Sequence, residues 1–394
     1  MIKVAKFGGS SCASAEQFRK VKDIVLSDKS RHYIVVSAPG KRASGDTKVT
    51  DLLYRLQDAV ADEKKFQETL QTIKDRYQEI IDGLGLQFSL AADFDQIEQD
   101  LKAGADRDYA ASRGEFLNAK LMAAYLGFSF IDSASCFVFK EDRSCDYQKT
   151  EEDIRAALKD IDYAVFPGFY GANERGEVVT FSRGGSDVTG SLIAAAEHVD
   201  LYENWTDVSG FLVADPRIVP NPEVIDYITY RELRELSYMG AGVLHEDAIF
   251  PVRREGIPIQ IKNTNRPEDH GTLIVQNTLK KPRFIITGVS GKKDFCAINI
   301  EKAMMNSEIG FARKLLSVLE DNNISFEHIP SGIDTMTLVI HQEELEHCEQ
   351  KILNGIQRAV NPDLIELESD IALIAVVGRG MKSSRGVAGR VFSA

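Results

Sequence analysis

Apolar runs and amphipathic segments alternate along the first two hundred residues. Residues 2–7 and 32–38 are apolar runs of strand length. Residues 14–27, between them, carry apolar side chains at helical spacing, namely Phe18, Val21, Ile24 and Val25. Another helix is expected from about Thr50, after a glycine-containing loop. This order predicts an α/β fold in which a parallel or mixed sheet carries helices on both faces.

Further strands are expected from the apolar runs at 128–131, 163–166 and 257–261. Residues 61–103 are polar, charged and helical in pattern, and we interpret them as a pair of solvated surface helices. A polar, turn-rich stretch follows the last strand, and we place a domain boundary in it, near Pro282.

The C-terminal part contains an internal repeat. Residues 305–317 (MNSEIGFARKLLS) align without gaps on residues 381–393 (MKSSRGVAGRVFS). An apolar strand precedes each copy, at 297–300 and at 372–377, and a turn and a helix follow. Each unit is too small to bury its apolar face alone, so two copies of a small βαβ-type module are expected. The second copy stops inside its helix at Ala394, and we expect its later strands to be missing.

Composition and charge narrow the classes of function. At 394 residues the chain is long enough for two or three domains. Its net charge of −13 argues against a nucleic-acid partner, which needs a basic surface, but not against a nucleotide. Five cysteines without a CxxC pair are typical of a reduced, cytoplasmic protein. Neither a membrane span nor a signal peptide is expected from the pattern of apolar residues.

The segment Gly8–Ser11 lies where the first strand ends and a helix is expected to start. Backbone N–H groups and the helix dipole favour a phosphate at such a position, and Lys6 just upstream could reach it. A Gly-Gly turn after a strand is more often only a turn, so the pattern alone leaves both interpretations open.

Two other glycine-containing stretches resemble phosphate motifs only in part. Residues 40–47 (GKRASGDT) carry the glycines of a P-loop, but Asp46 stands where that motif needs lysine, and a carboxylate would repel phosphate. Residues 378–380 begin like a dinucleotide fingerprint, but Ser383 replaces its third glycine. We therefore reject both motifs.

The segment Arg183–Asp187 (RGGSD) carries the strongest functional pattern. Its glycines let the backbone approach a ligand closely, and its arginine offers a planar fork suited to a carboxylate or a phosphate. A helix is expected over 188–197, which Ser186 or Asp187 could simply cap. Because capping does not explain the adjacent Arg-Gly-Gly, we favour an anion site.

Weaker patterns concern a second polar cluster and three single residues. Trp205–Gly210 with Ala214–Arg217 fits either a nucleotide site at a strand end or a routine Asp-Pro turn. Glu115 stands at an expected helix start, where an acid complements the dipole. His245 is more typical of a packed histidine than of a base. Cys12 is either a buried apolar residue or a reactive thiol whose pKa is lowered at a helix start.

Together and in order, these motifs resemble the aspartate kinases (aspartokinases) of the amino acid kinase family. The resemblance rests on Lys6–Ser11, Ser37-Ala38, Thr50–Leu52, Gly114-Glu115, Ser182–Asp187, Trp205–Gly210 and Asp215–Arg217, which span nearly the whole chain. It implies an amino acid kinase fold, a mostly parallel sheet sandwiched by helices, followed by tandem α+β regulatory domains of the ACT type. The implied catalytic domain is 1–282, the first ACT-type domain 283–366, and the incomplete start of a second 367–394.

The resemblance also implies the reaction. This is the ATP- and Mg²⁺-dependent phosphorylation of the side-chain carboxylate of L-aspartate to 4-phospho-L-aspartate, an entry step toward lysine, threonine and methionine. An aspartate side chain, with a pKa of about 3.9, is ionised at neutral pH and needs no general base. Positioning and neutralisation of phosphoryl charge would therefore carry catalysis.

Residue roles follow from the resemblance by position. Lys6 and Asp187 are the implied catalytic residues, and no residue is assigned as a metal ligand. The amino-acid substrate is assigned to Ser37, Thr50, Glu115, Arg183 and Ser186, with Arg183 on its α-carboxylate and Glu115 toward its ammonium. The phosphates and the nucleotide are assigned to Lys6, Gly8, Gly9, Ser10, Thr206, Asp207 and Arg217.

The repeated modules are expected to bind an amino-acid effector, with lysine as the first candidate and threonine as the second. The positions concerned are Met305, Ser307, Gly310, Met381 and Ser383. A purely structural role at the start of a helix would account for these residues equally well. A homodimer or homotetramer through this region is also implied.

Two departures from the family pattern affect the nucleotide side. Gly242 stands where many relatives carry lysine, and Glu246 stands where many carry proline. Two other functions are weighed: another amino acid kinase, of the glutamate or acetylglutamate class, and a non-catalytic effector-binding regulator. The tandem repeat and Trp205–Asp207 favour aspartate, while the retained Lys6 and Asp187 argue against a regulator.

Overall fold

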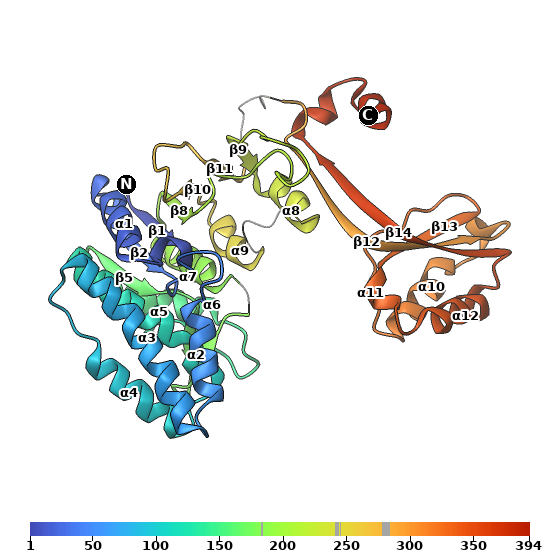
Figure 1. Ribbon diagram of the computed structural model, residues 1–394. Coiled ribbons are helices and arrows are strands. Elements are labelled where there is room, and N and C mark those ends of the chain that lie inside the picture. The colour runs from blue at the N-terminus through green and yellow to red at the C-terminus, as the bar shows by residue number, and fades with distance from the viewer. Residues whose placement is uncertain (183, 241–243, 245, 278–283) are drawn as a thin grey trace. The chain divides into compact units, whose positions relative to one another are not determined.

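The computed structural model describes residues 1–182, 184–240, 244, 246–277 and 284–394, without the side chains of Glu246 and Asp247. The chain divides into two compact units (Figure 1). Unit 1 comprises Met1–Gly288 and Val377–Ala394, and unit 2 comprises Val289–Val376. The boundary expected near Pro282 lies outside the described residues, and the assignment of domains to functions stays a prediction.

Eight strands of unit 1 form one sheet in the order β3-β5-β2-β1-β8-β10-β11-β9. Their bounds are β1 Lys3–Phe7, β2 Arg31–Val36, β3 Ser129–Phe130, β5 Ala164–Pro167, β8 Leu201–Thr206, β9 Tyr227–Thr229, β10 Ile259–Asn263 and β11 Thr272–Val275. Every neighbouring pair is parallel except β10 with β11, which is antiparallel. The predicted mostly parallel sheet is confirmed, although the strand expected at 128–131 is only two residues long.

Helices lie on both faces of this sheet because successive strand residues point to opposite sides. In β1, Val4 belongs to one apolar core and Ala5 and Phe7 belong to another. The helices of unit 1 are α1 Ala15–Ser27, α2 Val49–Asp58, α3 Glu63–Leu84, α4 Ala91–Lys102, α5 Arg107–Leu126, α6 Tyr147–Leu158, α7 Gly185–Ala196, α8 Tyr230–Tyr238, α9 Glu246–Arg254 and α13 Val387–Ser393. Helices α1 to α5 contribute to the core that contains Phe7, and α6 to α9 contribute to the other (Figure 1).

Two of the expected helical regions differ in detail from their predictions. The region 61–103 does form two helices, but α3 buries a stripe of side chains at helical spacing, so it is not merely a solvated surface helix. That stripe comprises Phe66, Leu70, Ile73, Tyr77 and Ile80. The predicted phosphate loop, Gly8–Ser11, lies mostly within a short 3-10 helix, η1 Gly9–Cys12, and Ser14 then caps α1 with its hydroxyl.

A smaller sheet joins β4 Val138–Phe139, β6 Tyr170–Asn173 and β7 Val178–Thr180, in that order. A further 3-10 helix, η2 Ser133–Ser135, precedes it. Its strand β6 carries Tyr170, which is fully buried and donates a hydrogen bond to Asp132 at 2.7 Å. Strand β7 of this side sheet packs against α5, and β6 packs against α7.

The C-terminal segment of unit 1 packs on the segment that precedes β12. The buried carboxylate of Glu232, in α8, accepts hydrogen bonds from the hydroxyl of Thr287 at 2.7 Å and from the backbone N–H of Arg379 at 3.2 Å. Burial opposes ionisation, but hydrogen bonds from Thr287 and Thr229 and the charge of Arg379 outweigh it and lower the pKa of Glu232. Of residues 367–394, expected to begin a second regulatory domain, Val377–Ala394 thus belong to unit 1, whereas 367–376 belong to unit 2.

Unit 2 is a three-stranded sheet with helices on one face (Figure 1). The strands, in the order β13-β12-β14, are β12 Gly288–Glu301, β13 Thr335–His341 and β14 Leu364–Val377. The helices are α10 Phe311–Glu320, α11 Gln342–Leu345 and α12 Glu349–Val360. Apolar side chains of α10 and α12 share a core with Ile298 and Leu338 of the sheet. This α+β arrangement agrees with the fold expected for the first C-terminal module.

The predicted internal repeat has matching local structure. In each copy a long strand is followed by a 3-10 helix, η3 Met305–Ser307 or η4 Arg379–Ser383, and then by an α-helix. A glycine with positive φ precedes both α-helices, with 79° at Gly310 and 78° at Gly386. Such φ values favour glycine, which explains why this residue is identical in the two copies.

None of the helices in the described parts of the chain is both long enough and apolar enough to cross a membrane.

Candidate active site

The candidate site lies at the carboxyl ends of β1, β2 and β8, where ligands of α/β sheets commonly bind. Phe7 and Trp205 are paired in register at the ends of β1 and β8, and Gly8 donates its backbone N–H to the carbonyl of Trp205 at 3.0 Å. The two predicted phosphate and nucleotide segments are therefore neighbours in space, although they lie far apart in the sequence.

Glycine is required where the phosphate loop meets the next loop. The N–H of Gly40 donates to the carbonyl of Gly9 at 2.8 Å. A Cβ atom added at Gly40 would lie 2.6 Å from the carbonyl carbon of Gly9, and one added at Gly9 would lie 2.9 Å from the carbonyl oxygen of Ala38. Backbone atoms cannot yield to such contacts, so side chains are excluded from the floor of the site.

Lys6 and Asp187 form a nearly buried ion pair. Nζ of Lys6 lies 2.6 Å from Oδ1 of Asp187, and the two side chains are 10% and 15% exposed. Asn204 of β8 donates to the same carboxylate oxygen at 2.8 Å. The hypothetical Cβ of Gly8 would lie 3.7 Å from Nζ of Lys6, which puts this ammonium directly beside the phosphate loop.

The RGGSD segment turns into α7 at Gly184, whose φ of 58° suits glycine. Arg183 lies outside the described residues, so its predicted contact with a carboxylate stays a prediction. Ser186 accepts a hydrogen bond from the hydroxyl of Ser37 at 3.0 Å, which joins two residues predicted to bind the substrate. A Cβ at Gly168 would lie 2.5 Å from the Ser186 side chain, so this close approach also depends on a glycine.

Glu115 lies in the middle of α5 rather than at a helix start, so its interpretation as a first-turn acid was wrong. Its side chain is buried, and Oε2 has no hydrogen-bond partner among the described residues. Burial raises the pKa of Glu115 to about 8, although backbone groups at Ala38 and Glu115 itself and the charge of Arg113 favour the anion. A buried carboxylate with one unpartnered oxygen that lines a cavity is suited to a cationic ligand group.

Several of these residues line one cavity of about 460 Å³. Its described lining residues are Gly9, Ser10, Ser37, Ala38, Pro39, Gly40, Lys41, Lys48, Thr50, Glu115 and Asp207. Residues predicted for the substrate and residues predicted for the phosphates thus meet around a single space. Thr50 is in the first turn of α2.

Four polar residues of the site were missed by the sequence analysis. Asn118 follows Glu115 by one turn of α5 and donates to the carbonyl of Ser37 at 2.7 Å, while its Oδ1 has no partner among the described residues. Asn204 stands out as a polar residue within a buried strand, a pattern that could have revealed it. Lys41 and Lys48 could not be recognised in this way, because they lie in an irregular loop where no periodic pattern of buried and exposed positions exists.

Of the three side chains predicted to bind the nucleotide, Thr206, Asp207 and Arg217, only Asp207 lines the described cavity. The Thr206 hydroxyl donates to Asp207 at 3.2 Å, and Asp207 lines the cavity. Arg217 is instead exposed and forms an ion pair with Asp215 at 2.6 Å. The departures noted from the family pattern, Gly242 and the side chain of Glu246, lie outside the described part of the structure, as does His245.

Cys12 is a buried residue, and the hypothesis of a lowered thiol pKa was wrong. Burial raises the pKa of Cys12 to about 12, despite the opposing influence of Asn118 and of the Lys6 charge. The thiol is fully inaccessible. A short 3-10 helix offers too small a dipole to offset the loss of solvation.

The expected effector positions lie in different units and are described separately. In unit 2, Met305 is buried in the apolar core, whereas Ser307 and Gly310 flank the turn before α10. In unit 1, Met381 and Ser383 belong to η4. Binding of an effector at these residues stays a prediction.

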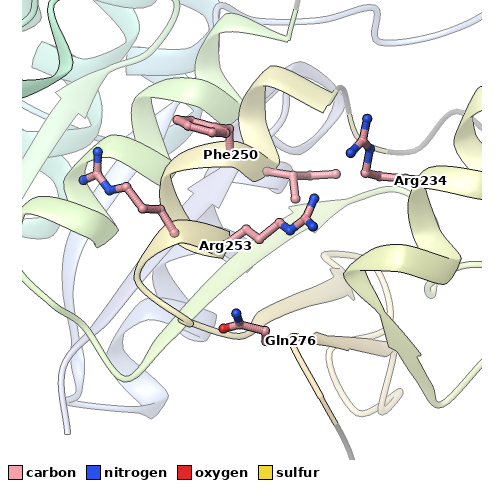
Figure 2. Close-up of a pocket in the computed structure, with 6 residues that line it drawn as sticks. Arg234, Phe250, Arg253 and Gln276 are labelled. Atoms are coloured by element: carbon pink, nitrogen blue, oxygen red, sulfur yellow. The ribbon is translucent and has the colours of Figure 1, made fainter.

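A second cavity in unit 1, of about 430 Å³, contains none of the predicted site residues (Figure 2). It is lined by Arg234, Ile249, Phe250, Arg253, Arg254 and Gln276. Arg254 is engaged in an ion pair with Glu151. No residue group of three or more His, Cys, Asp or Glu side chains that could hold a metal ion occurs within the described residues.

Comparisons with known proteins agree with this geometry. The sequence model of the amino acid kinase family matches residues 1–263. The chain is 39% identical to aspartokinase 3 of Bacillus subtilis, an alignment that covers the whole chain and 90% of the relative. It is similar to the crystal structure of Clostridium acetobutylicum aspartate kinase, with a TM-score of 0.89 and 51% identity over the whole chain and 90% of that structure.

A more distant likeness supports the fold. The structure of Escherichia coli aspartokinase III in complex with aspartate and ADP has a TM-score of 0.75 and 24% identity, over the whole chain and 91% of that structure. The same enzyme in complex with lysine and aspartate has a TM-score of 0.73 and 25% identity, over the whole chain and 90% of that structure. Family model, relatives and fold agree, and the chain belongs to the aspartokinases of the amino acid kinase family.

Proposed function

We propose that this protein transfers the terminal phosphoryl group of ATP to the side-chain carboxylate of L-aspartate, giving 4-phospho-L-aspartate and ADP. The observation that carries the proposal is one cavity, lined both by Glu115, which is buried with Oε2 unpartnered among the described residues, and by Gly9 and Ser10 of the predicted phosphate loop. An amino-acid ammonium would pair with Glu115, while the other end of the substrate reaches the phosphates. Membership of the aspartokinases supports aspartate as the acceptor and supports a role in amino-acid biosynthesis.

The transfer needs no proton movement. An ionised carboxylate oxygen attacks the γ-phosphorus, a new O–P bond forms, and the bond to the β,γ-bridging oxygen breaks, so that its electron pair leaves with ADP. Lys6 neutralises charge on the transferred group, and Asp187 together with Asn204 fixes the direction of its ammonium. Ser37, Ser186 and Thr50 hold the acceptor in position.

Mg²⁺ is proposed as the companion of the nucleotide. This ion usually keeps several waters and binds through phosphates with only one or two carboxylates. Asp207, which lines the cavity, could supply such a carboxylate, so the residues present fit the ion. When bound, Mg²⁺ would supply positive charge to the phosphates.

Regulation and assembly are proposed from the relatives. The complex of E. coli aspartokinase III with lysine supports lysine as the effector of this chain, with threonine as the second candidate. The C-terminal α+β region would carry the effector and join two or four copies of the chain. A cytoplasmic location fits the proposed use of ATP and free amino acids.

A hydroxylamine trap tests the proposed reaction. The protein is incubated with ATP, Mg²⁺ and one acid at a time, and the acyl phosphate is measured as its hydroxamate. Hydroxamate with aspartate alone is the expected result. Product with glutamate or acetylglutamate instead would assign another amino acid kinase activity, and no product with any acid would favour a non-catalytic regulator.

A further inference from the structure

The loop 40–48, which contains the stretch 40–47 rejected above as a P-loop, forms part of the wall of the candidate active site. Gly40, Lys41 and Lys48 of this loop line the same cavity as Ser10 and Glu115. The close backbone contact of Gly40 with Gly9 fixes where the loop starts, and Lys48 is the residue that precedes α2. The loop therefore begins and ends beside the proposed reactants.

Buried and charged contacts hold this loop in one conformation. Arg76, in α3, is almost fully buried; it donates to Asp46 at 2.6 Å and to the carbonyl of Gly40 at 2.6 Å. Arg42 adds hydrogen bonds to the Asp46 carboxylate. Side-chain and backbone hydrogen bonds from Arg42 and the pairing with Arg76 lower the pKa of Asp46. The aspartate that excludes a P-loop is thus the anchor of the loop.

The two lysines of the loop have no such partners. Among the described residues, no side-chain hydrogen bond or ion pair is formed by Lys41 or Lys48, although the carbonyl of Lys48 accepts from the N–H of Leu52. The two are the only basic residues of the described cavity lining. Lys6 is already paired with Asp187, so part of its charge is neutralised before a ligand binds. Both residues are exposed at the cavity, so their ammonium groups can turn toward an anion bound there.

We propose that Lys41 and Lys48 bind the terminal phosphate of the nucleotide during its transfer, an inference that rests on the proposed function. Several negative charges meet in this cavity, because a polyphosphate and a dicarboxylic acid bind together. Lysine suits a phosphate as a mobile point charge with three donors. Because they line the same cavity as Ser10 of the predicted phosphate loop, the two ammonium groups would approach the γ-phosphate there and would stabilise the acyl phosphate after transfer.

The test compares K41M, K48M and the double variant with K64M. Lys64 is a matched control, because its side chain is 85% exposed on α3 and outside the cavity. Calorimetry measures the Kd values of a non-hydrolysable ATP analogue (AMP-PNP) and of ADP, and the hydroxamate assay gives KM for aspartate. Thermal unfolding verifies that each variant is folded.

Each single variant is expected to weaken AMP-PNP binding about tenfold, and the double variant about 100-fold. Each substitution removes one charge-assisted hydrogen bond to the phosphate, and the two losses should multiply. ADP binding and the KM for aspartate should change less than about threefold, and K41R and K48R should recover part of the loss. AMP-PNP affinity equal to that of K64M, an equal loss for ADP, or an effect on aspartate alone would each overturn the proposal. The calorimetry needs no phosphoryl acceptor, so failure of the proposed reaction would be recognised separately, by absence of hydroxamate with the unmodified protein.

Discussion

Nζ of Lys6 and Oδ1 of Asp187 lie 2.6 Å apart, although one residue is on the first strand and the other is in the first turn of α7. Because both side chains are largely shielded from solvent, the pair is held in place before any nucleotide binds. Asn204 restrains the carboxylate from the neighbouring strand. The lysine charge is thus prepared for a phosphoryl group and needs little reorganisation during the reaction.

Replacing Lys6 by methionine should lower kcat on the order of 100- to 1000-fold, because the charge acts mainly on the transition state. Binding of aspartate, measured by calorimetry, should change only a few-fold. Asp187→Asn should show a smaller loss of kcat, since the ammonium is retained but less well directed. Turnover of the Lys6 variant close to that of K64M would contradict the role of Lys6.

Aspartate binding should depend on pH through Glu115. Its pKa of about 8 in the free protein means that a proton must leave before the carboxylate can pair with an ammonium. Affinity should therefore rise with pH up to about 8 and then level off, with proton release at lower pH. In Glu115→Gln this rise should disappear and affinity should fall roughly 10- to 100-fold. Calorimetry in buffers of different ionisation enthalpy measures both effects, and an unchanged pH profile in the variant would exclude Glu115.

Glu115 should also affect stability in the absence of substrate. Its folded-state pKa of about 8 lies above the ordinary value of 4.5, so the folded chain holds a proton that the unfolded chain loses. The free energy of unfolding should therefore fall as pH rises from about 4.5 to 8 and then stay level. Denaturant unfolding of the native protein and Glu115→Gln across this range measures the difference. Parallel pH curves for the two proteins would argue against the raised pKa.

Arg183 is expected to hold the α-carboxylate of the substrate. Arg183→Ala should raise the KM for aspartate by about two orders of magnitude, as for loss of a bidentate charge-assisted contact. Arg183→Lys should recover only part of this loss because lysine cannot make the planar, two-point contact. If the KM for aspartate is unchanged and that for ATP rises, Arg183 belongs to the nucleotide side.

Cys12 should resist alkylation in the folded protein. Its thiol is inaccessible and its raised pKa, about 12, leaves almost no thiolate near neutral pH. Iodoacetamide followed by mass spectrometry should label the partly exposed Cys348 first and Cys12 only after unfolding. ATP should not change the rate at Cys12; rapid labelling that ATP prevents would restore the hypothesis of an exposed, activated thiol.

Much of the catalytic fold could be predicted because its strands are short, continuous apolar runs. Such runs are buried on both faces of a parallel sheet, as in β1 and β2, and their carboxyl ends mark where a ligand binds. The predicted phosphate loop follows this rule after β1, whereas the RGGSD segment comes after β7 of the small side sheet. The grouping of residues 377–394 with unit 1 could not be predicted, since it depends on the contacts of Glu232 with two segments that are distant in sequence.

The sequence by itself determined the α/β class, the C-terminal repeat and the glycine-rich segments, because apolar periodicity and glycine conformation act locally. Only the tertiary structure decided the chemistry of the cavity. Glu115 acquires its raised pKa and its free oxygen from burial in α5, and Lys41 and Lys48 owe their place to the Arg76–Asp46 contact. Solvation and charge pairing depend on which distant segments pack together, and no local pattern of residues contains that information.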